Sequence, residues 1–100
     1  MSINTPSLPI ANAFEILQNT NDKNEKRMQF AKEVIHFAFS NYDNNNLTDL
    51  ASYIAKRFKQ NYNEEWNCSI WEWNKGGIFY YSTKRIAIKY KNHKIVIWRN

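Results

Sequence analysis

Hydrophobic positions along this chain follow a helical period up to residue 62 and a strand period after it. The first helical stripe recurs at three- and four-residue spacing and predicts one face of a helix of roughly 18 residues. Its members are Met28, Ala31, Val34, Ile35, Ala38 and Tyr42. A second stripe comprises Leu50, Tyr53, Ile54, Arg57 and Phe58, opposite a polar face, and predicts a helix that ends near Asn61.

Local signals suggest where these helices begin and end. Asp22-Lys23-Asn24-Glu25 resembles a capping box, with an N-cap acid and a Glu three residues later. The segment 43–46 is Asp-Asn-Asn-Asn, a composition that favours turns and caps, so we expect the first helix to end there. Thr48 is the residue that we expect to cap the second helix.

After the second helix, apolar residues alternate with polar ones. We expect strands at 66–73, 78–81, 85–91 and 94–99, and a weaker one at 13–18. Lys75-Gly76-Gly77 separates the first two, and Asn92-His93 suits a tight hairpin turn. Consecutive helices followed by consecutive strands predict an α+β fold, with two helices packed on an antiparallel sheet.

Length and composition favour one globular domain. The chain has 100 residues, of which 43% are hydrophobic and 16% aromatic, enough for a single modest core. Residues 1–12 contain both prolines, Pro6 and Pro9, and we expect a flexible tail followed by a domain over 13–100. There is no signal-peptide pattern and no run of apolar residues long enough for a membrane helix, so we expect a cytoplasmic protein without a membrane partner.

The net charge of +5 is unevenly distributed. The last acidic residue is Glu72, and seven Lys or Arg residues follow it. A basic half of this kind can attract nucleic acid, an acidic peptide or an anionic surface. A sheet face kept soluble by lysines explains the same pattern, and charge alone favours that simpler explanation.

Residues for catalysis or metal binding are not grouped in the sequence. Two separated histidines, His36 and His93, and one cysteine give no metal-ligand spacing. Cys68 falls within a predicted strand, where a buried small hydrophobe is the better explanation than a nucleophile. Glu64-Glu65 has no third catalytic group beside it. We therefore expect a protein that is not an enzyme and that has no cofactor and no metal.

One segment is specific enough to indicate a family. The run DLASYIAKRFKQNYNEEWNCSI, residues 49–70, resembles the second helix and first long strand of the small dynein light chains, and the resemblance extends from about Phe14 to the C-terminus. The matching positions are Asp49, Leu50, Ala51, Ser52, Ile54, Lys56, Phe58, Tyr62, Asn63, Trp66 and Cys68. Tyr62 and Asn63 would close the helix, and Trp66 and Cys68 would share one face of the strand beneath it.

The resemblance implies a symmetric homodimer in which one strand of each subunit, here roughly Asn74 to Tyr81, crosses to the partner's sheet. It implies binding of short disordered peptides by strand addition, two per dimer. Dynein intermediate chain and other disordered segments are the partners that it implies, in the cytoplasm and on the cytoskeleton as part of a dynein motor complex.

The site residues carried over by the resemblance fall into two groups. The expected peptide-binding residues are Asn19, Thr48, Asn74, Lys75, Gly76, Gly77, Ile78, Phe79, Tyr80, Tyr81, Ile86, Ile88 and Tyr90. The expected dimer-interface residues are Asn67, Gly77, Phe79 and Tyr81.

Several positions depart from the family pattern. Asn67 replaces an interface His whose protonation makes dimerisation pH-sensitive, and an Asn cannot titrate in this way. Thr48 replaces a Lys, Ile78 replaces a groove Tyr, and Tyr80 replaces a groove Thr. A large Tyr80 would crowd the pocket for the central Gln of a Thr-Gln-Thr type peptide. We therefore expect an altered preference, toward more apolar or acidic peptides.

Two other interpretations are compatible with the sequence. Trp71, Trp73, Tyr80 and Tyr81 alternate with Lys75, Lys84 and Arg85, as in proteins that hold single-stranded nucleic acid by stacking and basic contacts. Packing at a dimer interface explains these aromatic residues better, so nucleic acid is the less favoured partner. The other interpretation is a structural dimeriser whose peptide groove is blocked.

Overall fold

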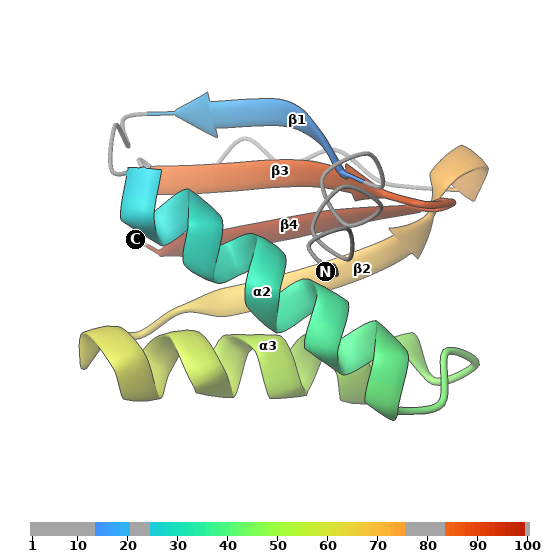
Figure 1. Cartoon of the computed structure of the whole chain (residues 1–100), viewed down its shortest axis with the longest axis horizontal. Coiled ribbons are helices and arrows are strands. Elements are labelled where there is room, and N and C mark those ends of the chain that lie inside the picture. Colours follow the sequence, from blue (N-terminus) through green and yellow to red (C-terminus); the bar gives the residue numbers. More distant parts are fainter. Residues whose placement is uncertain (1–13, 21–24, 76–83, 100) are drawn as a thin grey trace, which may run out of the picture.

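Two helices pack on one face of a four-stranded antiparallel sheet (Figure 1). A computed structural model describes residues 14–20, 25–75 and 84–99. The elements are β1 (Phe14–Thr20), α2 (Glu25–Asn41), α3 (Leu47–Tyr62), β2 (Asn67–Glu72), the 3₁₀ turn η1 (Trp73–Lys75), β3 (Lys84–Tyr90) and β4 (His93–Arg99). The predicted α+β fold is confirmed. The expected tail and the strand expected at 78–81 lie outside the described residues.

The second helix begins two residues earlier than the sequence suggested. Asn46, not Thr48, is its N-cap, because the Asn46 side chain accepts a hydrogen bond from the Asp49 backbone N–H at 3.1 Å. Thr48 lies inside the first turn, so its expected role as the cap is wrong. At the other end Asn63 adopts a left-handed conformation and its N–H bonds the Lys59 carbonyl, which confirms the predicted closure.

The core lies between the two helices and the sheet. Ile54 and Phe58 of α3 and Ile35 of α2 have no exposed surface. Phe58 packs against Trp66 with ring centroids 5.2 Å apart, and Cys68 borders the same cluster. The predicted placement of Trp66 and Cys68 beneath the helices is therefore confirmed. Apolar burial of this kind is the main favourable term in folding.

Among the described strands the order in the sheet is β1-β3-β4-β2, so β1 and β2 form the two edges of this sheet. The β3–β4 hairpin turns at Lys91-Asn92, and Lys91 takes a positive φ of 53°. The predicted turn at Asn92-His93 is therefore displaced by one residue, and His93 begins β4 instead. Strand β2 ends at Glu72, because Trp73 begins a 3₁₀ turn and its N–H bonds the Asn92 carbonyl at 2.9 Å.

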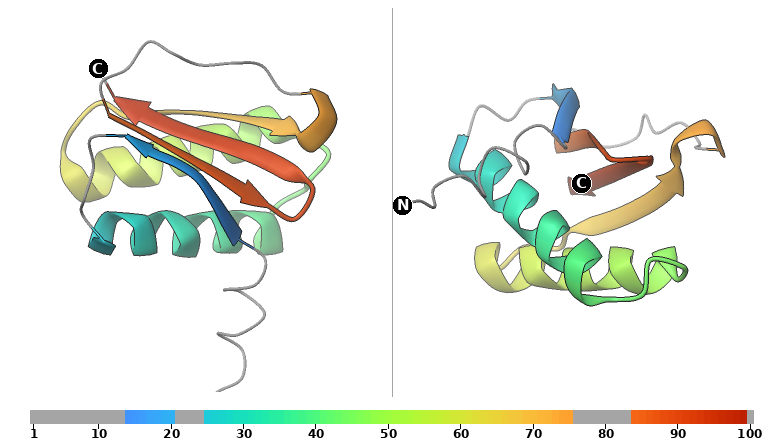
Figure 2. Two further views of the ribbon diagram at one scale, coloured as in Figure 1. Left: turned by 90° about the horizontal axis from the view of Figure 1, so that it is seen from above. Right: turned by 45° about the vertical axis from the view of Figure 1, so that its right-hand side comes forward.

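The two faces of the sheet have different chemistry. The inner face, which the helices cover, consists of Ile70, Ile86, Ile88, Tyr90, Ile95 and Ile97, all buried in the core. Alternation along each strand sends the neighbouring residues to the opposite side, which no described helix covers (Figure 2). We call this side the outer face. It comprises Asn67, Ser69 and Trp71 of β2, Lys94, Val96 and Trp98 of β4, and Arg85, Ala87 and Lys89 of β3.

Candidate functional site

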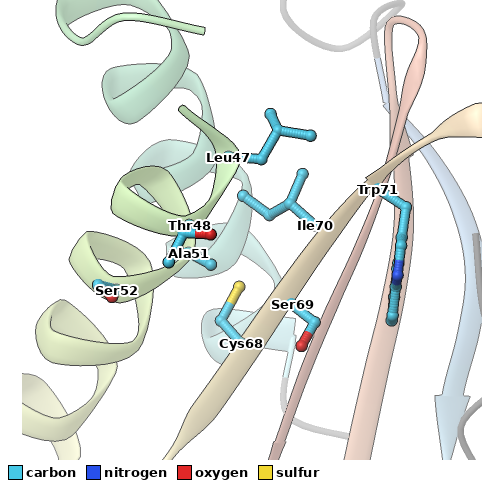
Figure 3. A pocket seen from close by; sticks show the side chains of 8 residues that line it. All are labelled: Leu47, Thr48, Ala51, Ser52, Cys68, Ser69, Ile70 and Trp71. Carbon is cyan, nitrogen blue, oxygen red and sulfur yellow. The ribbon is translucent and has the colours of Figure 1, made fainter. Parts of the chain in front are cut away.

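A groove of about 240 Å³ lies between the first half of α3 and the edge strand β2. Leu47, Thr48, Ala51 and Ser52 line it from the helix, and Cys68, Ser69, Ile70 and Trp71 line it from the strand. In Figure 3 the Cys68 sulfur and the Ile70 side chain point toward the helix, whereas Ser69 and Trp71 lie on the other side of β2. The groove therefore follows β2, an edge of the sheet that the described strands form.

The groove offers backbone hydrogen-bonding groups rather than reactive side chains. An edge strand has a row of N–H and C=O groups directed away from its sheet, and these can pair with another extended chain. Apart from Leu47, the side chains on the groove's helix wall are short, so an added strand can approach β2 closely. The Cys68 thiol is only partly exposed, and burial raises its pKa, so it stays protonated and is a poor nucleophile.

Few of the expected peptide-binding residues outside β3 lie within the described part of the chain. Thr48 lines the groove. Asn74 and Lys75 are exposed in η1, directly after β2, and the Lys75 ammonium lies 3.7 Å from the Glu72 carboxylate. Asn19 pairs with Ile86 across β1 and β3. Residues 76–81, which include Gly76, Gly77, Ile78, Phe79, Tyr80 and Tyr81, lie outside the described residues.

Three expected groove residues are in the core instead. Ile86, Ile88 and Tyr90 are at most 1% exposed, and their side chains face the helices. His36 Nδ1 of α2 lies 3.0 Å from the Tyr90 hydroxyl, and burial raises the Tyr90 pKa. In the single chain these side chains are therefore part of the core, and their place in a peptide groove of the dimer stays a prediction.

The residues of β3 on the outer face are Arg85, Ala87 and Lys89. The sequence analysis named Arg85 only in the nucleic-acid interpretation, and it did not consider Ala87 or Lys89 as site residues. Ala87 is buried on this face, at 4% exposed, whereas Arg85 and Lys89 are partly exposed. Asn67, expected at the dimer interface, is exposed and also lies on the outer face.

In the described part of the chain, no group of side chains is arranged as a catalytic site. Glu64 and Glu65 point to separate cations, with Arg99 Nη1 at 3.6 Å from Glu64 and Lys59 Nζ at 3.1 Å from Glu65. Among residues 14–20, 25–75 and 84–99, no group of three His, Cys, Asp or Glu side chains is placed to bind a metal ion. No helix within those ranges has the length and apolarity to cross a bilayer.

Comparison with known proteins agrees with this geometry. The family model described as Dynein light chain type 1 matches residues 15–100. This chain belongs to the dynein light chain family. The match covers all the described elements apart from the first residue of β1. No curated protein is significantly similar to the sequence.

Solved structures show the same fold at low identity. The dynein light chain-like domain of the Fasciola hepatica calcium binding protein FhCaBP2 superposes with a TM-score of 0.70 at 19% identity, covering 88% of this chain and 92% of that chain. The dynein light chain-like domain of CsTAL3 superposes with a TM-score of 0.68 at 12% identity, covering 88% and 93%. These light chain-like domains share the fold of this chain across nearly their whole length.

Proposed function

We propose that this dynein light chain is a non-catalytic homodimeric hub that binds short disordered peptides by strand addition. The observation that carries the proposal is the open edge of β2 beside a groove of about 240 Å³. Strand addition needs an accessible edge, and side-chain pockets next to it then select the sequence. Membership of the dynein light chain family supports the same function.

The homodimer in this proposal forms when residues from about Asn74 to Tyr81 of one copy pair with the β2 edge of the other, and the peptide then adds beside that crossing strand. Asn74 and Lys75 follow β2 directly in the η1 turn, at the start of that segment. Two peptide sites held by one dimer raise the effective concentration of the second binding event. Such a dimer would clamp two partner chains side by side, as a subunit of a motor complex needs.

The proposed partners are dynein intermediate chain and other disordered segments, and the proposed location is the cytoplasm, on the cytoskeleton with a dynein complex. Family membership supports both. The proposal includes the absence of enzymatic activity, for which the separated histidines and the buried Cys68 thiol are the supporting observations.

The test is to block the groove without touching the core. Ser52 is exposed on the helix wall of the groove, and Ser52→Phe would fill the space beside β2. Ser40→Phe is the matched control, because Ser40 is also an exposed helical serine but does not line the groove. Mass would be measured by sedimentation equilibrium, and peptide binding on an array of disordered segments including dynein intermediate chain.

We expect the wild type and Ser40→Phe to be dimers that capture peptides, and Ser52→Phe to lose both properties while its circular dichroism is unchanged. A Ser52→Phe protein that dimerises and binds like the wild type would contradict strand addition at β2. A wild type that dimerises but captures no peptide would instead identify a structural dimeriser.

A further inference from the structure

An aromatic surface lies where α2 and α3 pack together, at the margin of the core (Figure 1). Phe37 is 47% exposed and Tyr42 is 50% exposed. The partly buried ring of Tyr53 joins them, since it stacks on Phe37 with centroids 5.9 Å apart and contacts Tyr42 at 5.1 Å. We call Phe37, Tyr42 and Tyr53 the aromatic cluster. None of the three lines the groove beside β2, so the proposed function does not account for their exposure.

The aromatic cluster is fixed to the two helices. Arg57 Nη1 donates a hydrogen bond to the Tyr53 hydroxyl at 3.0 Å, and the guanidinium carbon lies 5.9 Å from the Tyr53 centroid. The backbone N–H of Tyr42 bonds the Ala38 carbonyl at 3.1 Å, at the end of α2. A contiguous exposed apolar surface of this kind is typical of interaction sites. Because its rings are already held in place, little ordering is needed before a ligand packs on them.

The described part of the chain begins beside the same helix. Phe14, the first described residue, packs its ring on Tyr90 with centroids 4.6 Å apart. The Tyr90 hydroxyl lies 3.0 Å from His36 Nδ1 of α2. His36 directly precedes Phe37, so about a quarter of a helical turn separates their side chains. The chain that leads into Phe14 therefore meets α2 at the turn that presents Phe37.

The residues before Phe14 have a composition that suits an aromatic surface. Residues 1–13 contain no charged side chain, and they contain both prolines of the chain, Pro6 and Pro9. In the polyproline II conformation residues three apart lie on the same edge, about 9 Å from each other. Segments with this proline spacing bind grooves lined by aromatic residues, because their backbone is already extended and loses little entropy.

The length of chain between Pro9 and Phe14 is sufficient to reach the aromatic cluster. Five residues in an extended conformation span about 15 Å. An α-helix with its side chains is about 10–12 Å across, so this length can pass around α2 from the His36 side to the Phe37 side. A segment tethered so close to its site has an effective concentration on the order of millimolar.

We propose that residues 6–9, Pro-Ser-Leu-Pro, bind the aromatic cluster of their own chain, with Pro6 and Pro9 packed on its rings. The bound segment competes with any proline-containing segment of another protein for the same surface. This interaction uses neither the β2 edge nor the groove beside it, so it does not depend on the proposed peptide binding by strand addition.

The first test is a pair of reciprocal substitutions in the full-length, ¹⁵N-labelled protein. Phe37→Ser removes one ring of the cluster, and the amides of Ser7 and Leu8 report the effect on the proline segment. Ile16→Ser is the matched control, because Ile16 is also a large apolar residue, 43% exposed, but lies outside the cluster. Pro6→Ala with Pro9→Ala is the reciprocal change, reported by the backbone amides of the cluster.

We expect Phe37→Ser to move the Ser7 and Leu8 signals to those of an isolated peptide of residues 2–12, and to lower their order parameters below about 0.6. Ile16→Ser should leave both signals at their wild-type positions. The double proline variant should shift the amides of Tyr42 and Tyr53. Identical Ser7 and Leu8 signals in the wild type, in Phe37→Ser and in the isolated peptide would overturn the inference.

The second test is competition, measured by the anisotropy of the fluorescein-labelled peptide of residues 2–12. The double proline variant should bind this peptide about fivefold more tightly than the wild type does, the factor expected when the chain's own segment occupies the cluster in about 80% of molecules. Adding Phe37→Ser to that variant should abolish binding. Equal binding to the wild type and the double proline variant would mean that the cluster serves a separate partner, which overturns the inference.

Two further results would also overturn it. Ser7 and Leu8 shifts that grow with protein concentration would mean that the proline segment binds a second copy instead of its own chain. Absence of peptide binding to the double proline variant would mean that the aromatic cluster does not recognise this segment.

Discussion

The two faces of strand β3 differ in burial and in charge. Ile86, Ile88 and Tyr90 on one face have almost no exposed surface, whereas Arg85 and Lys89 on the other are partly exposed and charged. Since the same seven residues form both faces, backbone structure does not explain the difference. The inner set packs beneath two helices, whereas the two cations of the outer set reach solvent.

The same contrast holds for the two edges of the sheet. Strand β1 has a register shift between Ile16 and Gln18, and such a bulge protects an edge against pairing. Strand β2 pairs with β4 in unbroken register from Asn67 to Glu72. Its regular backbone and the groove beside it make β2 the edge that can accept another strand.

The largest expected effect is on the free energy of unfolding, which should respond differently to substitutions on the two faces of β3. Ile88→Ala should lower the free energy of unfolding by about 2–5 kcal/mol, because it removes fully buried methyl groups and leaves a cavity. Lys89→Ala, the next residue, should cost less than about 1 kcal/mol, the scale of its exposed contact with Trp73. Urea denaturation of both variants measures this difference, and similar losses for the two would contradict the division.

A second comparison separates two neighbouring residues at the start of α3. Asn46→Ala should destabilise the protein by about 1 kcal/mol, since it removes the side chain that caps the helix. Thr48→Ala should change stability by less than about 0.5 kcal/mol, because Thr48 is exposed. Thermal unfolding followed by circular dichroism would distinguish them, and a larger loss for Thr48→Ala would restore that residue as the cap.

A third comparison concerns two tyrosine hydroxyls. Tyr90→Phe should lower the free energy of unfolding by about 1 kcal/mol, because it removes the hydroxyl that lies 3.0 Å from His36 Nδ1. Tyr53→Phe should lower it by less, because the Tyr53 hydroxyl, which accepts a hydrogen bond from Arg57 Nη1, is nearer to water. Chemical denaturation of the two variants provides the ranking, and a costlier Tyr53→Phe would mean that the His36–Tyr90 contact adds little.

The smallest expected effect is a pH dependence from His93. Its burial lowers the pKa of the imidazole below the usual value, and Glu72 opposite it in the sheet raises that pKa to a lesser extent. The unfolded chain therefore binds the proton more readily, and stability should fall as pH drops below about 6.5, the usual His pKa. His93→Gln should reduce the slope of stability against pH between pH 7 and 5. An unchanged slope would mean that groups other than His93 cause the pH dependence of stability.

The spacing of hydrophobic residues and the composition predicted the fold, because both signals are local in the sequence. The stripe containing Ile54 and Phe58 and the alternation of Ile86 and Ile88 each specify an element, and the order of elements then implies helices on one face. The boundaries were less predictable. Asn46 and Thr48 are both good caps, and only the backbone conformation decides between them.

The candidate site was harder to predict, because a face depends on register. The expected groove residues Ile86, Ile88 and Tyr90 lie in the core of the single chain, which only the folded structure shows. Groove-lining residues also come from segments that are distant in sequence, such as Thr48 and Cys68, which only the packing of α3 on β2 brings together.

Backbone amide hydrogen exchange tests the account most directly. It would be measured on the wild-type protein and on Ser52→Phe. We predict slower exchange at amides of Asn67–Glu72 in the wild type, because an added strand pairs with the edge of β2, and little difference in β1. A difference confined to β1 or the helices, with β2 unchanged, would contradict strand addition at this edge.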